Sequence, residues 1–287
     1  MPVRSAVRAV VTDLDGTVVH HDGTVSDATL TAAADLAARR IPLIAATART
    51  PPGVATIGSL TPYLTIAVCS GGAVGWVPST AETLWRETIA PAGVDRLVRF
   101  TVARLAGAGM AVHDGQTWRM TGAYARQRGD RLRGRKETVP VADLARHPAC
   151  AMSICHPDRT SDELMRAVTA LGGGPAPTVT YSTTHVVDIA PAGVDKSSGV
   201  RRALAVLGVA PADAVAVGDM PNDLPMFALC GVAVAVAGAH PDVLAAATVV
   251  TSCIHDDGFA RALHALGAVD GGRIRRPGCT ACGPVPA

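Results

Sequence analysis

The sequence predicts an α/β protein whose core is a doubly wound parallel sheet, interrupted by an inserted α/β module. Two observations carry this prediction. Short apolar segments alternate with amphipathic ones near both ends of the chain, which is the rhythm of parallel sheets, but this rhythm stops near Val74 and returns only after Asp188. Several apolar segments also end in polar residues, and open α/β sheets bind ligands beyond the carboxyl ends of their strands.

The composition indicates a globular chain with room for two units. Of its 287 residues 48% are hydrophobic, enough to bury a core domain and a smaller one. A net charge of +2 and three residues each of Phe, Tyr and Trp argue against nucleic acid as the main partner. No apolar run reaches the ~18–20 residues that cross a bilayer, so we expect no membrane partner.

The ends of the chain and its cysteines favour a cytoplasmic protein. The first dozen residues lack the cleavage site of a signal peptide. Seven irregularly spaced cysteines favour reduced thiols over a disulfide framework. Cys279 and Cys282 form one Cys-x-x-Cys pair, which offers too few ligands for a zinc site. Residues 269–287, rich in Gly, Pro and Arg, are expected to form a flexible tail.

The first strand is predicted over Ala6–Thr12 and leads into Asp13-Leu14-Asp15-Gly16-Thr17. Side chains i and i+2 of an extended chain share a side, so Asp13 and Asp15 should project together beyond the strand's carboxyl end. An isolated Asp-x-Asp-Gly segment is more often a turn than a catalytic site, so partners elsewhere must decide.

A small hairpin is expected to follow over Val18–Val25, arching over the two carboxylates. Its His20 and His21 are more typical of a polar hairpin beside a pocket than of catalysis.

Two further strand and helix units complete the first part of the sheet. Ser26 is the predicted N-cap of a helix, because its hydroxyl can accept a hydrogen bond from the helix's first turn. The segments are a helix at Asp27–Arg40, a strand at Ile41–Ala46 leading to Thr47-Ala48-Arg49, a helix opened by Pro51-Pro52, and a strand at Tyr63–Cys69 leading to Ser70-Gly71-Gly72.

The inserted module should form a mostly antiparallel sheet covered on one face, because its strands are not each followed by a helix. The expected strands are Trp85–Ile89, Met110–Asp114, Gln116–Thr121, Ala149–Cys155, Thr178–Ser182 and Val186–Ile189, and the expected helices are Val94–Leu105 and Ser161–Leu171.

A basic stretch lies inside this module, with a net charge of +5 over residues 126–136. Such a run is usually a solvated loop, and the alternative is that it grips an anionic substrate. Its cations are Arg126, Arg128, Arg131, Arg133, Arg135 and Lys136.

The alternating rhythm resumes at Lys196, which opens a helix that runs to Leu207 and is stopped by Gly208. The next strand, Ala214–Val217, ends in Gly218-Asp219-Met220-Pro221-Asn222-Asp223. The remaining predicted segments are strands at Gly231–Ala237 and Thr248–Thr251 and helices at Pro241–Ala247 and Gly258–Leu266.

Four junctions between strand and helix therefore carry groups that suit phosphate chemistry. Clustered carboxylates repel one another unless a cation joins them, and Mg²⁺ prefers a few carboxylate oxygens together with substrate phosphate. A lysine, a threonine and backbone N–H groups can hold phosphoryl oxygens. The groups are Asp13 with Asp15, Thr47, Lys196, and Asp219 with Asn222 and Asp223.

In residue type, order and spacing these groups resemble the four motifs of the haloacid dehalogenase (HAD) superfamily, in its Cof-like phosphatase branch. The resemblance covers about residues 5–268. It implies a Rossmann-like HAD core formed by residues 1–75 and 189–268, and a large α/β cap formed by residues 76–188.

The resemblance also implies roles for the site residues. Asp13 would be the nucleophile that becomes an aspartyl-phosphate, and Asp15 would protonate the leaving group and then activate water. Thr47 and Lys196 would hold the phosphoryl oxygens.

The same resemblance implies a Mg²⁺ site and two further phosphate contacts. The metal would be held by the carboxylates of Asp13 and Asp219 and by the backbone carbonyl of Asp15. Asp223 would be a ligand through water or a partner for Lys196. Asn222, and with it Arg49, would contact the phosphate.

Some positions depart from the family pattern around the pocket. Ala48 stands where Gly is usual, Ser70-Gly71-Gly72 where Asn-Gly-Ala is usual, and Gly238 where Asn is common, while another Asn near Ile254 is absent. These departures put an inherited substrate preference in doubt more than the activity.

We therefore expect a Mg²⁺-dependent phosphatase of a small phosphorylated metabolite, with a sugar phosphate as first candidate. A phosphomutase of the same superfamily is the nearest alternative, although such mutases usually carry their cap after the first motif. A phosphate-ligand sensor without turnover is the other alternative, although Asp13 and Asp15 are both intact. Oligomeric state cannot be read from the sequence.

Overall fold

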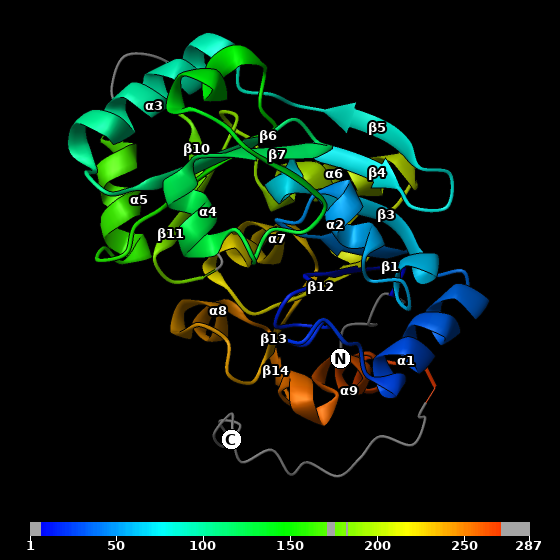
Figure 1. Ribbon diagram of the computed structural model, residues 1–287. Coiled ribbons are helices and arrows are strands. Elements are labelled where there is room, and N and C mark those ends of the chain that lie inside the picture. Colours follow the sequence, from blue (N-terminus) through cyan, green and yellow to red (C-terminus); the bar gives the residue numbers. More distant parts are fainter. Residues whose placement is uncertain (1–6, 171–175, 182, 271–287) are drawn as a thin grey trace.

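The computed structural model describes residues 7–170, 176–181 and 183–270, and two sheets organise them (Figure 1). The α/β prediction is confirmed. The larger sheet has the order β14 (Val249–Thr251), β13 (Val232–Val236), β12 (Ala214–Gly218), β1 (Ala9–Thr12), β2 (Leu43–Ala46), β3 (Leu64–Cys69), β4 (Val74–Val77) and β5 (Glu82–Arg86).

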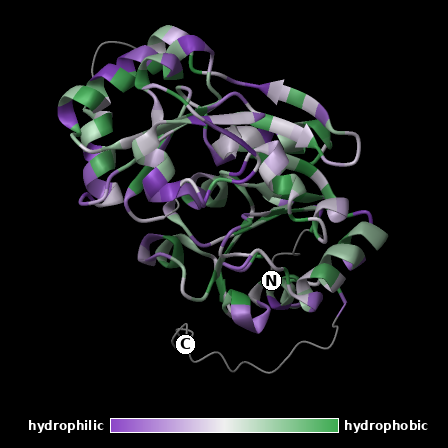
Figure 2. Cartoon of the chain, viewed as in Figure 1, coloured by the Kyte–Doolittle hydropathy of each residue, from purple (hydrophilic) through white to green (hydrophobic). Residues whose placement is uncertain are grey.

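The larger sheet is doubly wound, and its parallel strands are buried on both faces. Strand β1 pairs in parallel with β12 and β2, as expected for a central strand. Val10 packs with α1 (Asp27–Ala38) and α9 (Gly258–Ala265), whereas Val11 packs with the helices of the opposite face. Figure 2 shows the hydrophobic residues of these strands between the two helical layers. The helices of that opposite face are α6 (Lys196–Val206), α7 (Leu224–Leu229) and α8 (Pro241–Ala246).

The helix ends follow the capping residues that the sequence offers. Ser26 Oγ accepts a hydrogen bond from the Thr29 backbone N–H at 3.2 Å, which confirms it as the N-cap of α1. The two prolines open α2 (Pro51–Ala55), as predicted. Gly208 follows α6 with a φ of 65°, the left-handed conformation that ends many helices.

The smaller sheet and its helices form a second unit, here called the cap. Its strands have the order β10 (Thr178–Thr180), β11 (Val186–Ala190), β9 (Ala151–Cys155), β6 (Gly109–His113), β7 (Thr117–Met120) and β8 (Arg135–Thr138). Of its strand pairs, only β7 with β8 is parallel in the described part of the chain. Helices α3 (Pro91–Arg104) and α5 (Ser161–Thr169) cover one face, so the sheet is mostly antiparallel, as expected, with its main helical layer on one side.

The other face of the cap sheet turns toward the larger sheet (Figure 1). Helix α4 (Gly122–Arg128) packs on part of this face through Tyr124. The rest of the face is left to line a cavity. This arrangement decides which cap side chains can reach the active site.

One strand expected in the inserted module belongs to the larger sheet instead. We expected a strand at Trp85–Ile89, but β5 lies at Glu82–Arg86 and pairs antiparallel with β4. The ring of Trp85 lies against Gly75, where a Cβ would meet ring carbons at 2.3 Å, and this packing fixes the pair. The division into a core of 1–75 and 189–268 and a cap of 76–188 is a proposal, and this pairing moves its first boundary beyond Arg86.

One local prediction was wrong. No hairpin strands form over Val18–Val25: Val18 and Val19 are buried, and a tight turn follows, in which the His20 N–H donates to Thr24 O at 2.8 Å. The basic stretch 126–136 is in part the expected solvated loop, since residues 129–134 belong to no helix or strand. Its two ends lie in α4 and in the edge strand β8, and cations on an edge strand discourage pairing with other chains.

The expected tail is described only at its beginning. Val269 is buried against the core, and the Asp270 N–H donates to Asp35 Oδ2 at 2.6 Å, so these two residues of the predicted tail pack on the core. Cys279 and Cys282 lie outside the described residues. No helix in the described ranges combines the length and the apolar character that a bilayer span requires.

Candidate active site

A buried lysine joins two carboxylates at the carboxyl edge of the larger sheet. Lys196 is the first residue of α6, Asp13 follows β1, and Asp223 ends the short helix η5 (Pro221–Asp223) after β12. Lys196 Nζ donates to Asp13 Oδ1 and to Asp223 Oδ1, both at 2.6 Å. The side chain of Lys196 is 1% exposed. So deeply buried an ammonium requires such partners, and this one has two.

Burial and neighbouring charge perturb the protonation of this cluster. Burial raises the pKa of Asp13 well above its ordinary value, and Asp223 and Asp219 add to the rise, while Lys196 opposes it. Burial alone would lower the pKa of Lys196, but Asp13 and Asp223 outweigh it and the pKa is raised. The lysine therefore remains an ammonium. Perturbed groups of this kind cluster at functional sites.

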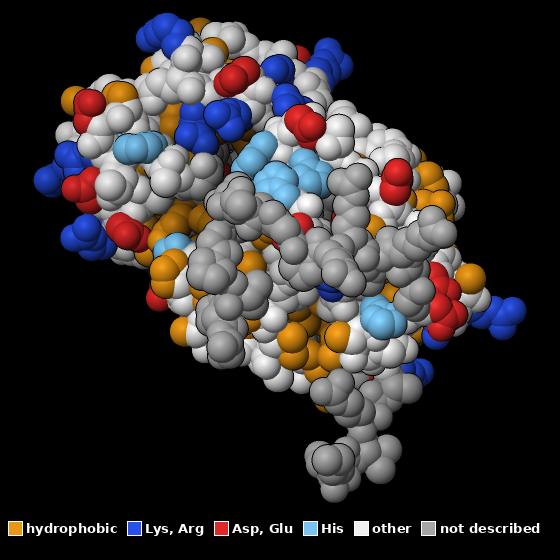
Figure 3. Space-filling view, turned by 90° about the horizontal axis from the view of Figure 1, so that it is seen from below, with side chains coloured by type: hydrophobic (Ala, Val, Ile, Leu, Met, Phe, Trp, Pro, Cys, Tyr) orange, Lys and Arg blue, Asp and Glu red, His pale blue; other side chains and the backbone are white. Residues whose placement is uncertain are grey.

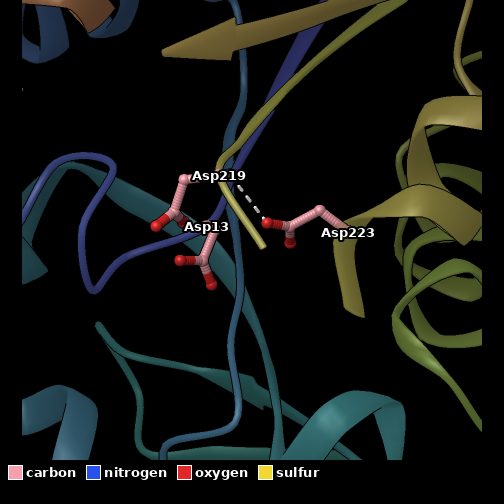
Figure 4. Close-up of side chains that lie close together, drawn as sticks. All are labelled: Asp13, Asp219 and Asp223. Carbon is pink, nitrogen blue, oxygen red and sulfur yellow. Dashed lines mark hydrogen bonds between the residues drawn. The ribbon is translucent and has the colours of Figure 1, made fainter. Parts of the chain in front are cut away.

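Asp219 completes a group of three carboxylates that suits a divalent cation (Figure 4). One oxygen from each of Asp13, Asp219 and Asp223 lies within 4.8 Å of the others. Burial, followed by the charge of Asp223, raises the pKa of Asp219 to about 7. A cation would remove this repulsion, and hard oxygen donors are what Mg²⁺ prefers, so the residues fit the metal that the sequence predicts.

The loop after β1 is shaped to receive Asp219. Thr17 Oγ1 donates to Asp219 Oδ1 at 3.0 Å. Gly16 has a φ of 87°, and a Cβ there would lie 2.4 Å from Asp219 Oδ2. Any side chain at Gly16 would displace the carboxylate. Thr17 belongs to the motif that the sequence shows, but its contact with Asp219 could not be read from it.

Both carboxylate oxygens of Asp223 already accept hydrogen bonds. Its Oδ2 accepts the backbone N–H groups of Asp219 at 2.9 Å and Met220 at 3.0 Å, and its Oδ1 accepts from Lys196. Of the two roles expected for Asp223, the partner of Lys196 is the one the geometry displays.

Asp15 lies in a different environment from Asp13. Its carboxylate accepts from Arg49 Nε at 2.8 Å and from Arg49 Nη2 at 2.6 Å, a bidentate pair. The side chain of Asp15 is 57% exposed, whereas that of Asp13 is 10% exposed. Arg49, expected at the phosphate, holds Asp15 here. The Asp15 carboxylate is also not part of the three-carboxylate group.

Polar groups without partners face the same region. Thr47 is buried, and its Oγ1 accepts the Arg49 N–H at 3.1 Å, which leaves its own proton free to be donated. Among the described residues, Asn222 Oδ1 and Ser70 Oγ are buried without a hydrogen-bond partner. Such atoms are costly unless a ligand or water meets them. Asn222 was predicted to contact the phosphate, whereas no role was predicted for Ser70.

These groups open into a cavity between the two sheets with an empty volume of about 480 Å³, including the solvent at its mouth. Ala48, Ser70, Lys196 and Asn222 line it on the core side. Trp118, Ala151, Thr178, Thr180 and Asp188 line it on the cap side.

The histidines of the first loop do not belong to this cavity. Neither His20 nor His21 is among its lining residues in the described structure, and the ring of His20 instead lies 5.2 Å from that of His255. Figure 3 shows several histidines gathered on the surface seen from below. The interpretation of these histidines as polar surface residues is consistent with this arrangement.

The fold and the site together define an α/β enzyme core whose lysine-bearing acidic cluster lies at the carboxyl edge of the sheet, under an inserted cap. The chain belongs to the haloacid dehalogenase-like hydrolase family, whose model matches residues 10–263.

Curated relatives with similar sequences are named as phosphatases. A phosphoglycolate phosphatase of Natronomonas pharaonis is 42% identical over 28% of this chain and 34% of its own length. One of Halorubrum lacusprofundi is 32% identical over 49% of this chain and 58% of its own length. The match with this chain thus covers from about a third to somewhat over half of the length of these relatives.

Solved structures of the same fold cover nearly the whole chain. A sugar phosphatase of HAD subclass IIB has a TM-score of 0.80 at 20% identity, covering 91% of this chain and all of that one. A HAD phosphatase from Bacteroides thetaiotaomicron has a TM-score of 0.77 at 19% identity, covering 92% and 96%. This similarity establishes the fold.

Proposed function

We propose that the protein is a Mg²⁺-dependent phosphatase that hydrolyses a small phosphorylated metabolite through an aspartyl-phosphate on Asp13. The observation that carries the proposal is the buried bridge from Lys196 to Asp13 and Asp223, beside Asp219 and at the mouth of a cavity. An ammonium held at that point can bind phosphoryl oxygens, and its charge opposes the rise that burial causes in the pKa of Asp13.

In the first step, a carboxylate oxygen of Asp13 attacks phosphorus, and the bond from phosphorus to the ester oxygen breaks. Asp15 donates a proton to the departing oxygen, which leaves as an alcohol. Lys196, Thr47 and Asn222 donate hydrogen bonds to the phosphoryl oxygens as charge develops on them. Arg49 must release the Asp15 carboxylate or hold it at the correct angle for this transfer, because the two are paired.

In the second step, Asp15 takes a proton from water, and the water oxygen attacks the phosphorus of the aspartyl-phosphate. The bond between phosphorus and Asp13 breaks, inorganic phosphate forms, and Asp13 is regenerated. The same residue thus acts as acid and then as base.

The metal would be held by the carboxylates of Asp13 and Asp219 and by the backbone carbonyl of Asp15. When bound, Mg²⁺ supplies positive charge that neutralises the phosphoryl group. Asp223 would hold this site in position, because its carboxylate accepts hydrogen bonds from Lys196 and from the backbone N–H groups of Asp219 and Met220.

The cavity favours a small substrate, and a sugar phosphate is the first candidate. The cap supplies one wall of the cavity, which favours a small molecule over the surface of a phosphoprotein. A phosphomutase would use the same aspartyl-phosphate, but it would return the phosphoryl group to a sugar rather than to water.

Hydrolysis of 4-nitrophenyl phosphate in water enriched in ¹⁸O tests the proposal. We expect turnover that depends on Mg²⁺ and stops with chelator, with one ¹⁸O in each inorganic phosphate. Full turnover in excess chelator would refute the metal requirement. Absence of inorganic phosphate, with transfer of the label-free phosphoryl group to added sugar, would favour the mutase.

A further inference from the structure

We propose that Asp188 determines the substrate preference by binding the hydroxyl groups of an uncharged leaving group and by rejecting a leaving group with a second negative charge. This inference rests on the proposed function, since it names the class of alcohol that the phosphatase releases. It concerns the cap side of the cavity, whereas the catalytic cluster lies on the core side.

The strand that carries Asp188 points this side chain into the cavity. Val187 and Ile189 lie in the apolar layer under α3 and α5, so the intervening residue of β11 must face the other way. Asp188 lies directly opposite Thr180 on β10 and Ser153 on β9. The cross-strand row thus places hydroxyl groups on both sides of one carboxylate.

A chain of hydrogen bonds holds the carboxylate in place. The buried Tyr124 hydroxyl donates to Ser153 Oγ at 3.1 Å, and Ser153 hydrogen-bonds Asp188. Burial raises the pKa of Asp188, while this bond and the charge of Arg128 lower it. The side chain is therefore oriented before a ligand arrives, which is the requirement for a specificity residue.

The rest of the cap wall is neutral. Its other residues are Trp118, Ala151, Thr178, Thr180, Ile189 and Ala190, and the ring of Trp118 lies against that of His113 at a centroid distance of 4.5 Å. Of the residues described as lining the cavity, none belongs to the basic stretch 126–136. Arg128 is directed elsewhere, since its guanidinium donates to Thr184 O at 3.0 Å and to Thr183 Oγ1 at 3.3 Å.

This wall matches one kind of leaving group. Alcohol hydroxyls can donate to Asp188 and exchange hydrogen bonds with the two threonines, and the apolar side of a sugar can lie on Trp118. A leaving group with its own carboxylate would bring a second negative charge to Asp188, and Arg128, the cap cation that acts on Asp188, does not line the cavity. Like charges so placed are strongly unfavourable.

A pair of substrates that differ in one group tests the inference. Glycerol 3-phosphate ends in a hydroxymethyl group where 3-phosphoglycerate carries a carboxylate. We expect the parent to prefer glycerol 3-phosphate by about tenfold or more in kcat/KM. Asp188→Asn removes the charge but keeps the shape, so the ratio should fall by about tenfold, mainly because KM for 3-phosphoglycerate decreases.

Two controls separate charge at the cavity from charge in the cap. Asp158→Asn removes an exposed cap carboxylate whose side chain lies outside the cavity lining, and it should keep the parent's ratio within about twofold. Turnover of 4-nitrophenyl phosphate by the parent protein and by Asp158→Asn tests the proposed function separately. An unchanged substrate ratio in Asp188→Asn, or an equal change in Asp158→Asn, would overturn the inference while aryl phosphate turnover leaves the proposed function intact.

Binding measured without turnover keeps the test decisive if the proposed function itself fails. Calorimetry would compare both substrates on Asp13→Asn protein and on the Asp13→Asn/Asp188→Asn double variant. Tighter binding of glycerol 3-phosphate to the first protein, lost in the second, supports the role of Asp188. Equal affinities of the first protein for both substrates would refute it.

Discussion

The two walls of the cavity use charge in opposite ways. On the core side Lys196, Asp13 and Asp223 are buried, and Lys196 Nζ lies 2.6 Å from an oxygen of each carboxylate. Burial raises the pKa of Asp13, and the two carboxylates raise the pKa of Lys196. In the cap most cations are exposed, as in Arg131 and Arg133, and the cap side of the cavity holds one carboxylate, Asp188, among neutral side chains.

This difference separates reaction from recognition. Buried, paired charges act in a medium of low dielectric constant, where they stabilise a developing phosphoryl charge far more than they could in water. Exposed charges are screened by solvent and salt and contribute little. Substitutions on the core wall should therefore affect the rate of any reaction, and substitutions on the cap wall only the choice of substrate.

The largest effect should come from Asp13→Asn. The amide is a poor nucleophile and leaves Lys196 with one charged partner, so aryl phosphate turnover should fall by about 10⁴-fold or more. Asp27→Asn, an exposed carboxylate of the core on α1, is the matched control and should retain full activity. Undiminished turnover in Asp13→Asn would show that the buried charges of the core side do not determine the rate.

Asp15→Asn should have the next largest effect, and one that depends on the leaving group. Its proton matters most when the departing oxygen is basic, and general acid help is worth ~10²–10⁴-fold. We expect a loss of that order for an alkyl phosphate and a much smaller loss for 4-nitrophenyl phosphate, measured as single-turnover phosphoryl transfer. Equal losses for both substrates would contradict the role of Asp15 as acid.

Removal of Mg²⁺ should make stability fall with rising pH. Burial raises the pKa of Asp219 to about 7. Between its ordinary value near ~4 and that value, the folded state binds the proton more tightly than the unfolded state, so the free energy of unfolding decreases as the pH rises through this window.

Thermal unfolding of metal-free protein measures this effect. The Tm should be lower at pH 8 than at pH 5.5, on the order of 5 °C, and Mg²⁺ should restore much of the loss at pH 8. Asp219→Asn should flatten the profile and weaken the response to Mg²⁺. If the variant and the parent had the same profile, Asp219 would not be the titrating ligand.

The smallest effects are expected in the basic stretch of the cap. Arg131→Ala and Arg133→Ala remove exposed side chains that do not line the cavity, so each should keep the parent's ratio of kcat/KM between its best substrate and 4-nitrophenyl phosphate within about twofold. Arg128→Ala is the sharper test, because Arg128 interacts with Asp188. A change above about tenfold in the ratio for Arg131→Ala or Arg133→Ala would show that this stretch contributes to substrate recognition.

The sequence by itself was sufficient for the architecture and for most of the catalytic group. Apolar runs, caps and glycines are local signals, and they predicted the carboxyl ends of three core strands at Thr12, at Ala46 and one residue before Gly218. Since parallel strands end at one edge, the polar residues that follow them could be expected to meet. Asp13 and Lys196 do so although they are 183 residues apart.

Only the tertiary structure decided how these residues share their partners. Asp13 and Asp15 are alike in sequence, yet their environments differ. Asp13 is buried and accepts a hydrogen bond from Lys196, whereas Asp15 is exposed and pairs with Arg49, because burial and pairing depend on segments elsewhere in the chain. The same reason explains Ser70 and Asp188, whose importance comes from the cavity between two sheets. It also explains β5, which the packing of Trp85 on Gly75 assigns to the larger sheet. Local spacing predicts elements, but burial and pairing are properties of the assembled fold.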